Sequence, residues 1–169
     1  DRVSLEGEQG FQLSEELPNS LRMELAWASH QLLKATPAAS VLLVWDGKEL
    51  LRRGVLSQLP FAPGPILERA QQQGQSVALV NLTLYPGRSE FSYLPTNIPA
   101  LVVEPLAERG WLLVAGWSVR CFSRSDELWI TGLAEKLRTE LEGADLDQVT
   151  GLNQAAQTQG EFSHENQEL

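Results

Sequence analysis

The chain has 169 residues, of which 43% are hydrophobic, and a formal net charge of −9. This apolar fraction is ordinary for one globular domain and excludes global disorder, while the lack of a basic stripe disfavours nucleic-acid binding. No apolar run reaches the roughly 18–20 residues that cross a bilayer. Cys121 is the single cysteine, so an internal disulfide is also excluded.

The N-terminal segment is expected to be a flexible arm over residues 1–19, because residues 1–13 are mostly polar and show no hydrophobic period. From residue 20 onward, apolar residues recur every three or four positions, as on one face of a helix. The recurring residues are Leu21, Leu25, Ala28 and Leu32. The pattern predicts a helix over 20–35 that ends at Thr36-Pro37, since the residue before a proline disfavours helical backbone.

Two strands joined by a tight turn are predicted next. Residues 41–45 are a run of β-forming residues, Asp46-Gly47 is a strong hairpin signal, and residues 50–56 return as the second strand. Arg52 and Arg53 are adjacent on that strand, so their side chains lie on opposite faces. We expect one of them to face solvent and the other to pair with a carboxylate.

The remainder of the chain predicts two helices separated by strands. A short helix over 65–73 begins with a proline and ends at Gly74. The strands that follow are predicted over 76–84, 90–94, 100–105 and 111–119. A last helix is predicted over 124–142, because Ser123 and Asp126 have the spacing of a capping box and Gly143 suits a helix end.

The C-terminal residues 144–169 are expected to form an acidic tail that is disordered or weakly helical. They are rich in glutamine, asparagine, glutamate and glycine, and they contain no lysine or arginine. The folded domain is therefore predicted over residues 20–143.

The order of these elements predicts an α/β (α+β) fold. Consecutive short strands with tight turns indicate a central antiparallel sheet of five or six strands. The N- and C-terminal helices each carry one apolar stripe, so both are expected to cover the same sheet face. This arrangement is GAF-like, similar to GAF and PAS-like sensor domains, and by itself it fixes no function.

Two residues are candidates for chemistry by their type. His30 lies on the first predicted helix, where it would suit a haem or metal ligand, although a lone helical histidine is more often a surface residue. Cys121 follows Arg120 at a strand-to-helix junction, where a positive neighbour favours the reactive thiolate. Without a CxxC motif or a histidine nearby, a structural role is preferred. We therefore predict no catalytic residues and no metal site.

The five tryptophans suggest an interaction surface rather than an active site. They would suit stacking on a flat ligand such as a haem, but such residues are more often core or interface anchors. Trp27 and Trp129 lie on the two helices that are expected to pack together, which favours a helix–helix or dimer contact. The candidate interaction residues are Trp27, Arg120 and Trp129.

Several sequence segments taken together carry a further signal. They are Glu24–Ser29 with Leu32-Leu33, Leu51–Gly54, Tyr93–Asn97, Val103–Leu106, and a last block of Arg120–Ser123, Asp126, Trp129-Ile130 and Lys136-Leu137. The last block is the most specific because it combines unlike residue types at fixed spacing. Over about residues 20–141 the chain resembles the family for cofactor assembly of complex C, found in cyanobacteria and chloroplasts.

The resemblance implies a role in assembling the cytochrome b6f complex. Family members assist covalent attachment of the extra c-type haem of cytochrome b6 through a single thioether bond, and they work with related subunits. The expected partners are apocytochrome b6 and a paralogous subunit, in a homo- or heterodimer, with haem as a transient ligand and no tightly bound cofactor. The expected location is the thylakoid membrane, with this domain on the stromal or cytoplasmic side and the membrane helices missing from this chain.

Two alternative functions stand beside this non-enzymatic assembly role. The element order suits a sensor that binds a small ligand in a GAF-type pocket, between the sheet and a loop at residues 84–99. The second alternative is a thiol-dependent haem lyase that uses Cys121.

Overall fold

The computed structural model describes residues 1–165, and for residues 146–165 it gives the helical backbone alone. The described residues form six strands, three α-helices and two short 3₁₀ helices. In chain order these are β1 (Gln9–Leu13), α1 (Asn19–Ala35), β2 (Ala38–Trp45), β3 (Lys48–Val55), α2 (Pro65–Gln73), β4 (Val77–Leu79), η1 (Leu82–Leu84), η2 (Arg88–Phe91), β5 (Ala100–Leu106), β6 (Gly110–Gly116) and α3 (Arg124–Glu165). Among these described helices, none combines the length and the apolar character that crossing a bilayer requires.

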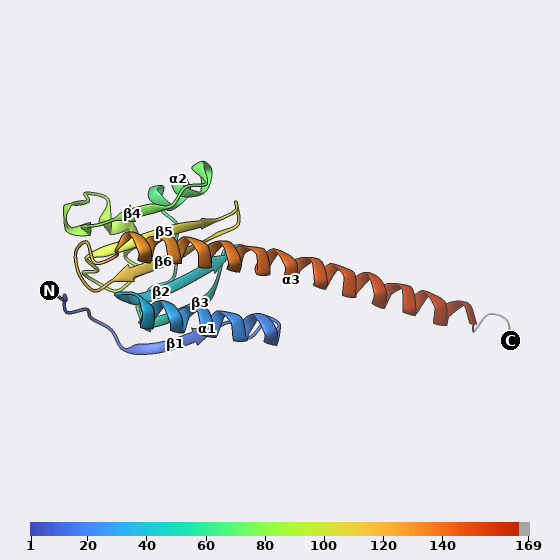
Figure 1. Ribbon diagram of the computed structural model, residues 1–169. Coiled ribbons are helices and arrows are strands. Elements are labelled where there is room, and N and C mark those ends of the chain that lie inside the picture. The colour runs from blue at the N-terminus through green and yellow to red at the C-terminus, as the bar shows by residue number, and fades with distance from the viewer. Residues whose placement is uncertain (166–169) are drawn as a thin grey trace.

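The strands form one antiparallel sheet in the order β1-β3-β2-β6-β5-β4 (Figure 1). The hairpin of β2 and β3 turns at Asp46 and Gly47, whose φ angles are +51° and +74°. Positive φ at both central residues is the geometry of the type I′ turn that the Asp-Gly pair predicts. The predicted antiparallel sheet of five or six strands is therefore confirmed.

One face of the sheet is covered by α1 and α3, as predicted (Figure 1). Their apolar stripes pack on alternate residues of the central strands and form one buried core. Its members include Leu21, Leu25, Ala28 and Leu32 of α1, Val41, Leu43 and Trp45 of β2, and Ile130, Leu133, Leu137 and Leu141 of α3. The hydrophobic period of each helix thus identified the face that it buries.

The opposite face is covered by α2 and by the irregular connection over residues 56–99. Leu42 and Val44 of β2 point into this second core, together with aromatic residues of the connection and of β6. Because both faces of the sheet are covered, every residue of β2 is buried. This explains why its sequence is a continuous apolar run rather than an alternating one.

The prediction of a flexible N-terminal arm over residues 1–19 is wrong for residues 9–13. These residues form the edge strand β1, which pairs with β3 from Gln9 opposite Val55 to Leu13 opposite Leu51. Backbone hydrogen bonds hold this strand, and only two of its five residues are partly buried. Because β1 is held by its backbone and not by buried side chains, its sequence has no alternating apolar pattern that would predict a strand.

The segment after α2 contains less strand than predicted. The predicted strand over 76–84 shortens to β4 and continues into η1, where the Asn81 side chain accepts a hydrogen bond from the Thr83 N–H at 3.2 Å. Such local side-chain bonds compete with strand ladders. The predicted strand over 90–94 is wrong, because residues 88–91 form η2.

The last helix begins as predicted but does not end at Gly143. The Ser123 N–H donates to the Asp126 carboxylate at 2.8 Å, and the Asp126 N–H donates to the Ser123 hydroxyl at 3.1 Å, which completes the capping box. Gly143 lies inside α3, where nothing stands within 4 Å of the position of a Cβ. A solvated glycine of this kind weakens a helix without ending it.

Of the two expectations for the tail over residues 144–169, disorder is wrong for residues 144–165 and the helical alternative is confirmed, because these residues continue α3. These residues include many alanines, glutamines, glutamates and leucines, which are good helix formers. Residues 166–169 lie outside the described residues. This last part of α3 projects away from the sheet (Figure 1).

Arg109 fixes α3 at the point where the helix leaves the sheet. Its guanidinium pairs with Asp46 in the turn after β2 and, at 2.6 Å, with Asp145 of α3. It also stacks on the Trp45 ring at 4.3 Å. The hydrogen bond from Arg109 holds the pKa of Asp46 below its usual value. Two hairpin turns and the last helix therefore meet at one ionic contact.

Candidate functional site

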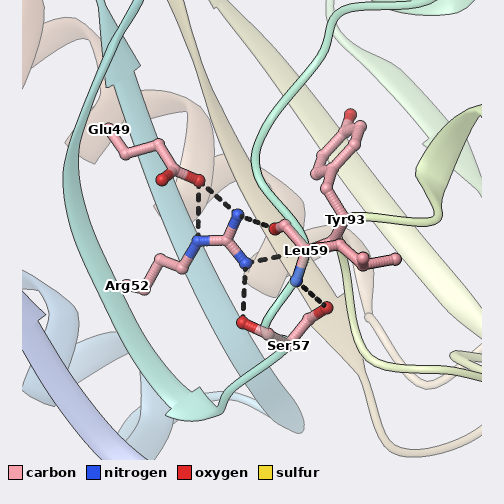
Figure 2. A network of polar contacts seen from close by, with 5 residues as sticks. All are labelled: Glu49, Arg52, Ser57, Leu59 and Tyr93. Carbon is pink, nitrogen blue, oxygen red and sulfur yellow. Dashed lines mark hydrogen bonds and ion pairs between the residues drawn. The ribbon is translucent and has the colours of Figure 1, made fainter.

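Arg52 lies buried between the sheet and the 56–99 connection, with 6% of its surface exposed (Figure 2). Its guanidinium donates to the backbone carbonyls of Ser57 at 3.2 Å, Leu59 at 2.9 Å and Tyr93 at 2.8 Å. It also pairs with Glu49, to which Nε donates at 2.8 Å. A planar fork of five N–H donors suits such a position. Arg52 therefore holds the connection onto the sheet.

The prediction that one of the two adjacent arginines pairs with a carboxylate is confirmed for Arg52. Arg53 points to the opposite face but is partly buried, and not fully solvent-facing as expected. It donates to the Ala26 carbonyl of α1 at 2.8 Å and lies 4.2 Å above the Phe11 ring. The alternation of side chains along a strand predicted that Arg52 and Arg53 lie on opposite faces. It could not predict their partners, because most of these come from distant parts of the chain.

Aromatic side chains fill the interior next to Arg52. The ring centroid of Phe61 lies 4.9 Å from that of Tyr93 and 5.8 Å from that of Trp111. The Trp111 indole donates to the Leu67 carbonyl at 2.8 Å. Burial raises the pKa of the Tyr93 phenol above its usual value. The space between the sheet and the connection, where a sensor would hold its ligand, is thus occupied by the protein's own side chains.

An open cleft of about 500 Å³ lies within the connection itself. Its apolar lining includes Leu59 and Phe91, and its polar lining consists of hydroxyl, amide and guanidinium groups from residues 83–97. Arg88 is the charged residue of this lining, and its guanidinium donates to the Thr83 carbonyl at 2.9 Å. The volume lies in the range of small-molecule sites. Periodicity could not have indicated this cleft, because it is built from irregular backbone.

The structure brings Trp27 and Trp129 to the outer side of the α1–α3 pair. Lys136 of α3 forms an ion pair with Glu24 of α1, and the two helices run antiparallel (Figure 1). Trp27 lies about one turn beyond Glu24, and Trp129 lies about two turns before Lys136, so both follow the ion pair in the same direction. Their exposed fractions are 48% and 43%.

The surface around these two tryptophans extends further along α1. Met23, one turn before Trp27, is 74% exposed. Gly132, between Trp129 and Lys136 on α3, has nothing within 4 Å of the position of a Cβ. We call Met23, Trp27, Trp129 and Gly132 the helix-pair surface. The tryptophans were identified from the sequence, whereas Met23 was missed and would have been found from its spacing of four residues to Trp27.

Arg120 does not belong to the helix-pair surface. It lies in the junction between β6 and α3, is exposed, and has a left-handed backbone with a φ of +53°. Its N–H donates to the Val80 carbonyl at 2.8 Å, which places it next to the end of β4. The three candidate interaction residues therefore lie in two separate places.

His30 and Cys121 are not brought together. His30 is exposed on α1. Cys121 is partly buried, with Sγ 4.0 Å from the Pro37 carbonyl oxygen. A Cβ added at Gly116 would lie 2.3 Å from this sulfur, so the thiol packs closely against β6. Among the residues that the structure describes, no cluster of histidine, cysteine, aspartate and glutamate could hold a metal ion.

Comparison with known proteins gives one family. Residues 1–137 match the CCB2/CCB4 family model, which is described as cofactor assembly of complex C. The chloroplastic CCB4 protein of Arabidopsis thaliana is 33% identical over 138 residues, which covers 75% of this chain and 46% of that protein. The corresponding CCB2 protein is 32% identical over 149 residues, covering 79% of this chain and 54% of that protein. The chain thus spans about half the length of these relatives.

Solved structures confirm the predicted GAF-like fold. The GAF domain/HD domain protein from Geobacter sulfurreducens has a TM-score of 0.59 and covers 76% of this chain and 95% of its own. Its sequence identity is 14%, so this likeness concerns the fold alone.

Proposed function

Because the chain belongs to the CCB2/CCB4 family for cofactor assembly of complex C, we propose that it is a non-enzymatic assembly factor for covalent haem attachment to cytochrome b6 of the cytochrome b6f complex. The family match over residues 1–137 is the observation that carries the proposal. Both relatives are named as proteins of complex C cofactor assembly.

The proposed role requires binding surfaces rather than a catalytic group. An assembly factor accelerates a covalent step when it holds the reacting partners in a productive pose. The aromatic side chains and Arg52 fill the domain's interior, which leaves the outer surface for partners. Haem enters this proposal as cargo on its way to apocytochrome b6, not as a resident cofactor.

The proposed setting is the thylakoid membrane, with this domain on the stromal or cytoplasmic side. The relatives are chloroplastic, which supports the organelle. This chain spans about half of their length, so membrane attachment through a segment outside it is part of the proposal.

The proposed partner of the helix-pair surface is a paralogous subunit, or a second copy of this chain. Two related subunits with separate names exist in Arabidopsis thaliana, which supports a paralogous partner. Tryptophan is enriched among the few residues that contribute most of the binding energy of an interface, and the helix-pair surface exposes two tryptophans together with Met23.

The proposal is tested by co-purification from the membranes of the host. Tagged protein is expected to retain both cytochrome b6 and the paralogous subunit in mild detergent, as quantified by immunoblotting. Changing Trp27 and Trp129 to serine together should reduce the retained paralogue at least tenfold, because a hot-spot residue typically contributes about 2 kcal/mol or more.

Leu84→Ser is the matched control for that variant. Leu84 is 76% exposed and lies on the connection that covers the other sheet face, so its loss should leave retention unchanged. Retention of neither cytochrome b6 nor the paralogue by the wild-type protein would contradict the proposal. If the tryptophan variant retains as much paralogue as the wild-type protein, the helix-pair surface is not the binding site for the paralogue.

A second candidate function is favoured by the 500 Å³ cleft in the connection. Its apolar lining with one arginine suits a small ligand that has an apolar body and an acidic group. If the domain is such a sensor, Arg88→Ala should weaken the binding of this ligand without changing retention of the paralogue.

A further inference from the structure

Within the part of the chain that the structure describes, the strand β4 leaves one edge of the sheet without a neighbouring strand. It is the last strand in the sheet order and pairs with β5 on one side. The alternate residues Ser76, Ala78 and Val80 along this edge are exposed. An exposed strand edge presents backbone N–H and C=O groups that can pair with an added strand.

A small cleft lies beside this open edge, between β4 and the first turns of α3. Its volume is about 190 Å³. Ala78, Val102 and Leu128 supply apolar walls, and the charged residues of the lining are Arg124, Glu127 and Glu104 of β5. We call this site the β4 cleft.

Glu104 is a buried carboxylate, with 4% of its surface exposed. Its two oxygens accept hydrogen bonds from the Ser76 hydroxyl and, at 2.6 Å, from the Thr131 hydroxyl. In the part of the chain whose side chains are described, no lysine or arginine forms an ion pair with it. A buried carboxylate is costly unless a positive charge compensates it, so this position favours a cation.

The size and charge of the β4 cleft select one kind of occupant. At about 190 Å³ it is smaller than typical small-molecule sites, and it is about large enough for one long side chain. Its lining carries Glu104 and Glu127 against Arg124, a net charge of −1. Apolar walls around a carboxylate match the alkyl stem and charged head of a basic side chain.

We propose that the β4 cleft binds an extended segment of a partner protein, which adds to β4 as a strand and places a lysine or arginine side chain against Glu104. The open edge supplies the backbone contacts along β4 itself, because the Val80 carbonyl just after this strand already accepts the Arg120 N–H. The cleft selects the basic side chain. Apolar residues on the segment would contact the exposed side chains of Val80 and Leu128. This surface is distinct from the helix-pair surface, because Leu128 and Thr131 face the β4 side of α3.

The proposal is tested by nuclear magnetic resonance titration of the full chain with a designed seven-residue peptide. The peptide alternates threonine and valine around one central lysine. Shift changes are expected at the backbone amides of residues 76–80 and near Thr131. A peptide with glutamate in place of the lysine should bind at least tenfold more weakly.

Variants of the protein test whether Glu104 is the carboxylate that binds the lysine of the peptide. Glu104→Gln should weaken binding of the lysine peptide at least tenfold. Glu108→Gln makes the same charge change in an exposed turn and should leave the affinity within twofold. Should Glu104→Gln fail to fold, Arg124→Gln replaces it, because loss of this competing charge should tighten binding at least twofold.

Several results would overturn the proposal. They are equal affinity for the lysine and glutamate peptides, unchanged affinity in the Glu104→Gln protein or in the Arg124→Gln protein that replaces it, shift changes away from β4, and no binding at millimolar peptide. Free butylamine that binds as tightly as the peptide would show that β4 contributes nothing, which also contradicts it.

Discussion

Replacing Arg52 with alanine should lower the free energy of unfolding by about 2–4 kcal/mol, because each hydrogen bond from a charged donor contributes about 1.5–3 kcal/mol and the lost bonds are only partly exposed. The change removes the donors for the carbonyls of Ser57, Leu59 and Tyr93 and leaves Glu49 without its guanidinium. The bond to the Tyr93 carbonyl is buried, and a buried carbonyl without a partner costs about 1–3 kcal/mol. The other two bonds are part-buried, so losing them costs less. Total stability is typically about 5–15 kcal/mol. Urea denaturation followed by tryptophan fluorescence measures this difference.

The neighbouring Arg53→Ala variant is the matched control for that experiment. Arg53 has the same side chain one position later on the same strand, but it points to the other face and is partly exposed. Its loss removes two part-buried hydrogen bonds, to the Ala26 carbonyl and the Ser29 hydroxyl, and the contact with Phe11, so about 1 kcal/mol is expected. Equal destabilisation by the two variants would contradict the role assigned to Arg52.

Replacing Gly54 with alanine should also destabilise the domain strongly, by roughly 2–5 kcal/mol from backbone strain and overpacking together. Gly54 has a φ of +96°, and an added Cβ would lie 2.2 Å from the Ala39 carbonyl oxygen. The residue sits between Gly10 of β1 and Ser40 of β2 in the ladders. Neither neighbouring strand can move away without breaking hydrogen bonds. Thermal and urea denaturation measure the loss.

Gly47→Ala separates the two causes of that loss. Gly47 also has a positive φ, +74°, but nothing stands within 4 Å of the position of its Cβ. Only the backbone strain should remain, which is about 1–2 kcal/mol. Gly54→Ala must therefore cost clearly more than Gly47→Ala. Equal costs would mean that the close approach of Ala39 is unimportant.

The sequence predicts those parts of the fold that local rules determine. The stripes from Leu21 to Leu32 and from Ile130 to Leu141 identify the buried helix faces, and Asp46-Gly47 identifies the hairpin. The edge strand β1 was missed because backbone pairing with β3 holds it. The composition of the distal half of α3 left disorder and a weak helix as alternatives, because it is polar and also contains good helix formers.

The candidate surfaces were predictable only in part. The helical positions of Trp27 and Trp129 placed both on one helix pair, but sequence could not show that Arg120 lies elsewhere, next to Val80. The adjacency of Arg52 and Arg53 indicated opposite faces, but not that Arg52 would bind carbonyls up to 41 residues away. The β4 cleft joins Ser76, Glu104 and Thr131, contacts that only the tertiary fold creates.

The proposed assistance to covalent haem attachment is tested most directly in the host, by a haem-peroxidase stain of cytochrome b6 after deletion of the gene. We expect the covalently bound haem to be lost in the deletion strain. Both the wild-type gene and a Cys121→Ala variant should restore it, since a non-enzymatic factor needs no thiol at that position. Normal covalent haem on cytochrome b6 in the deletion strain would show that the protein is not required for the attachment and would refute the proposed function.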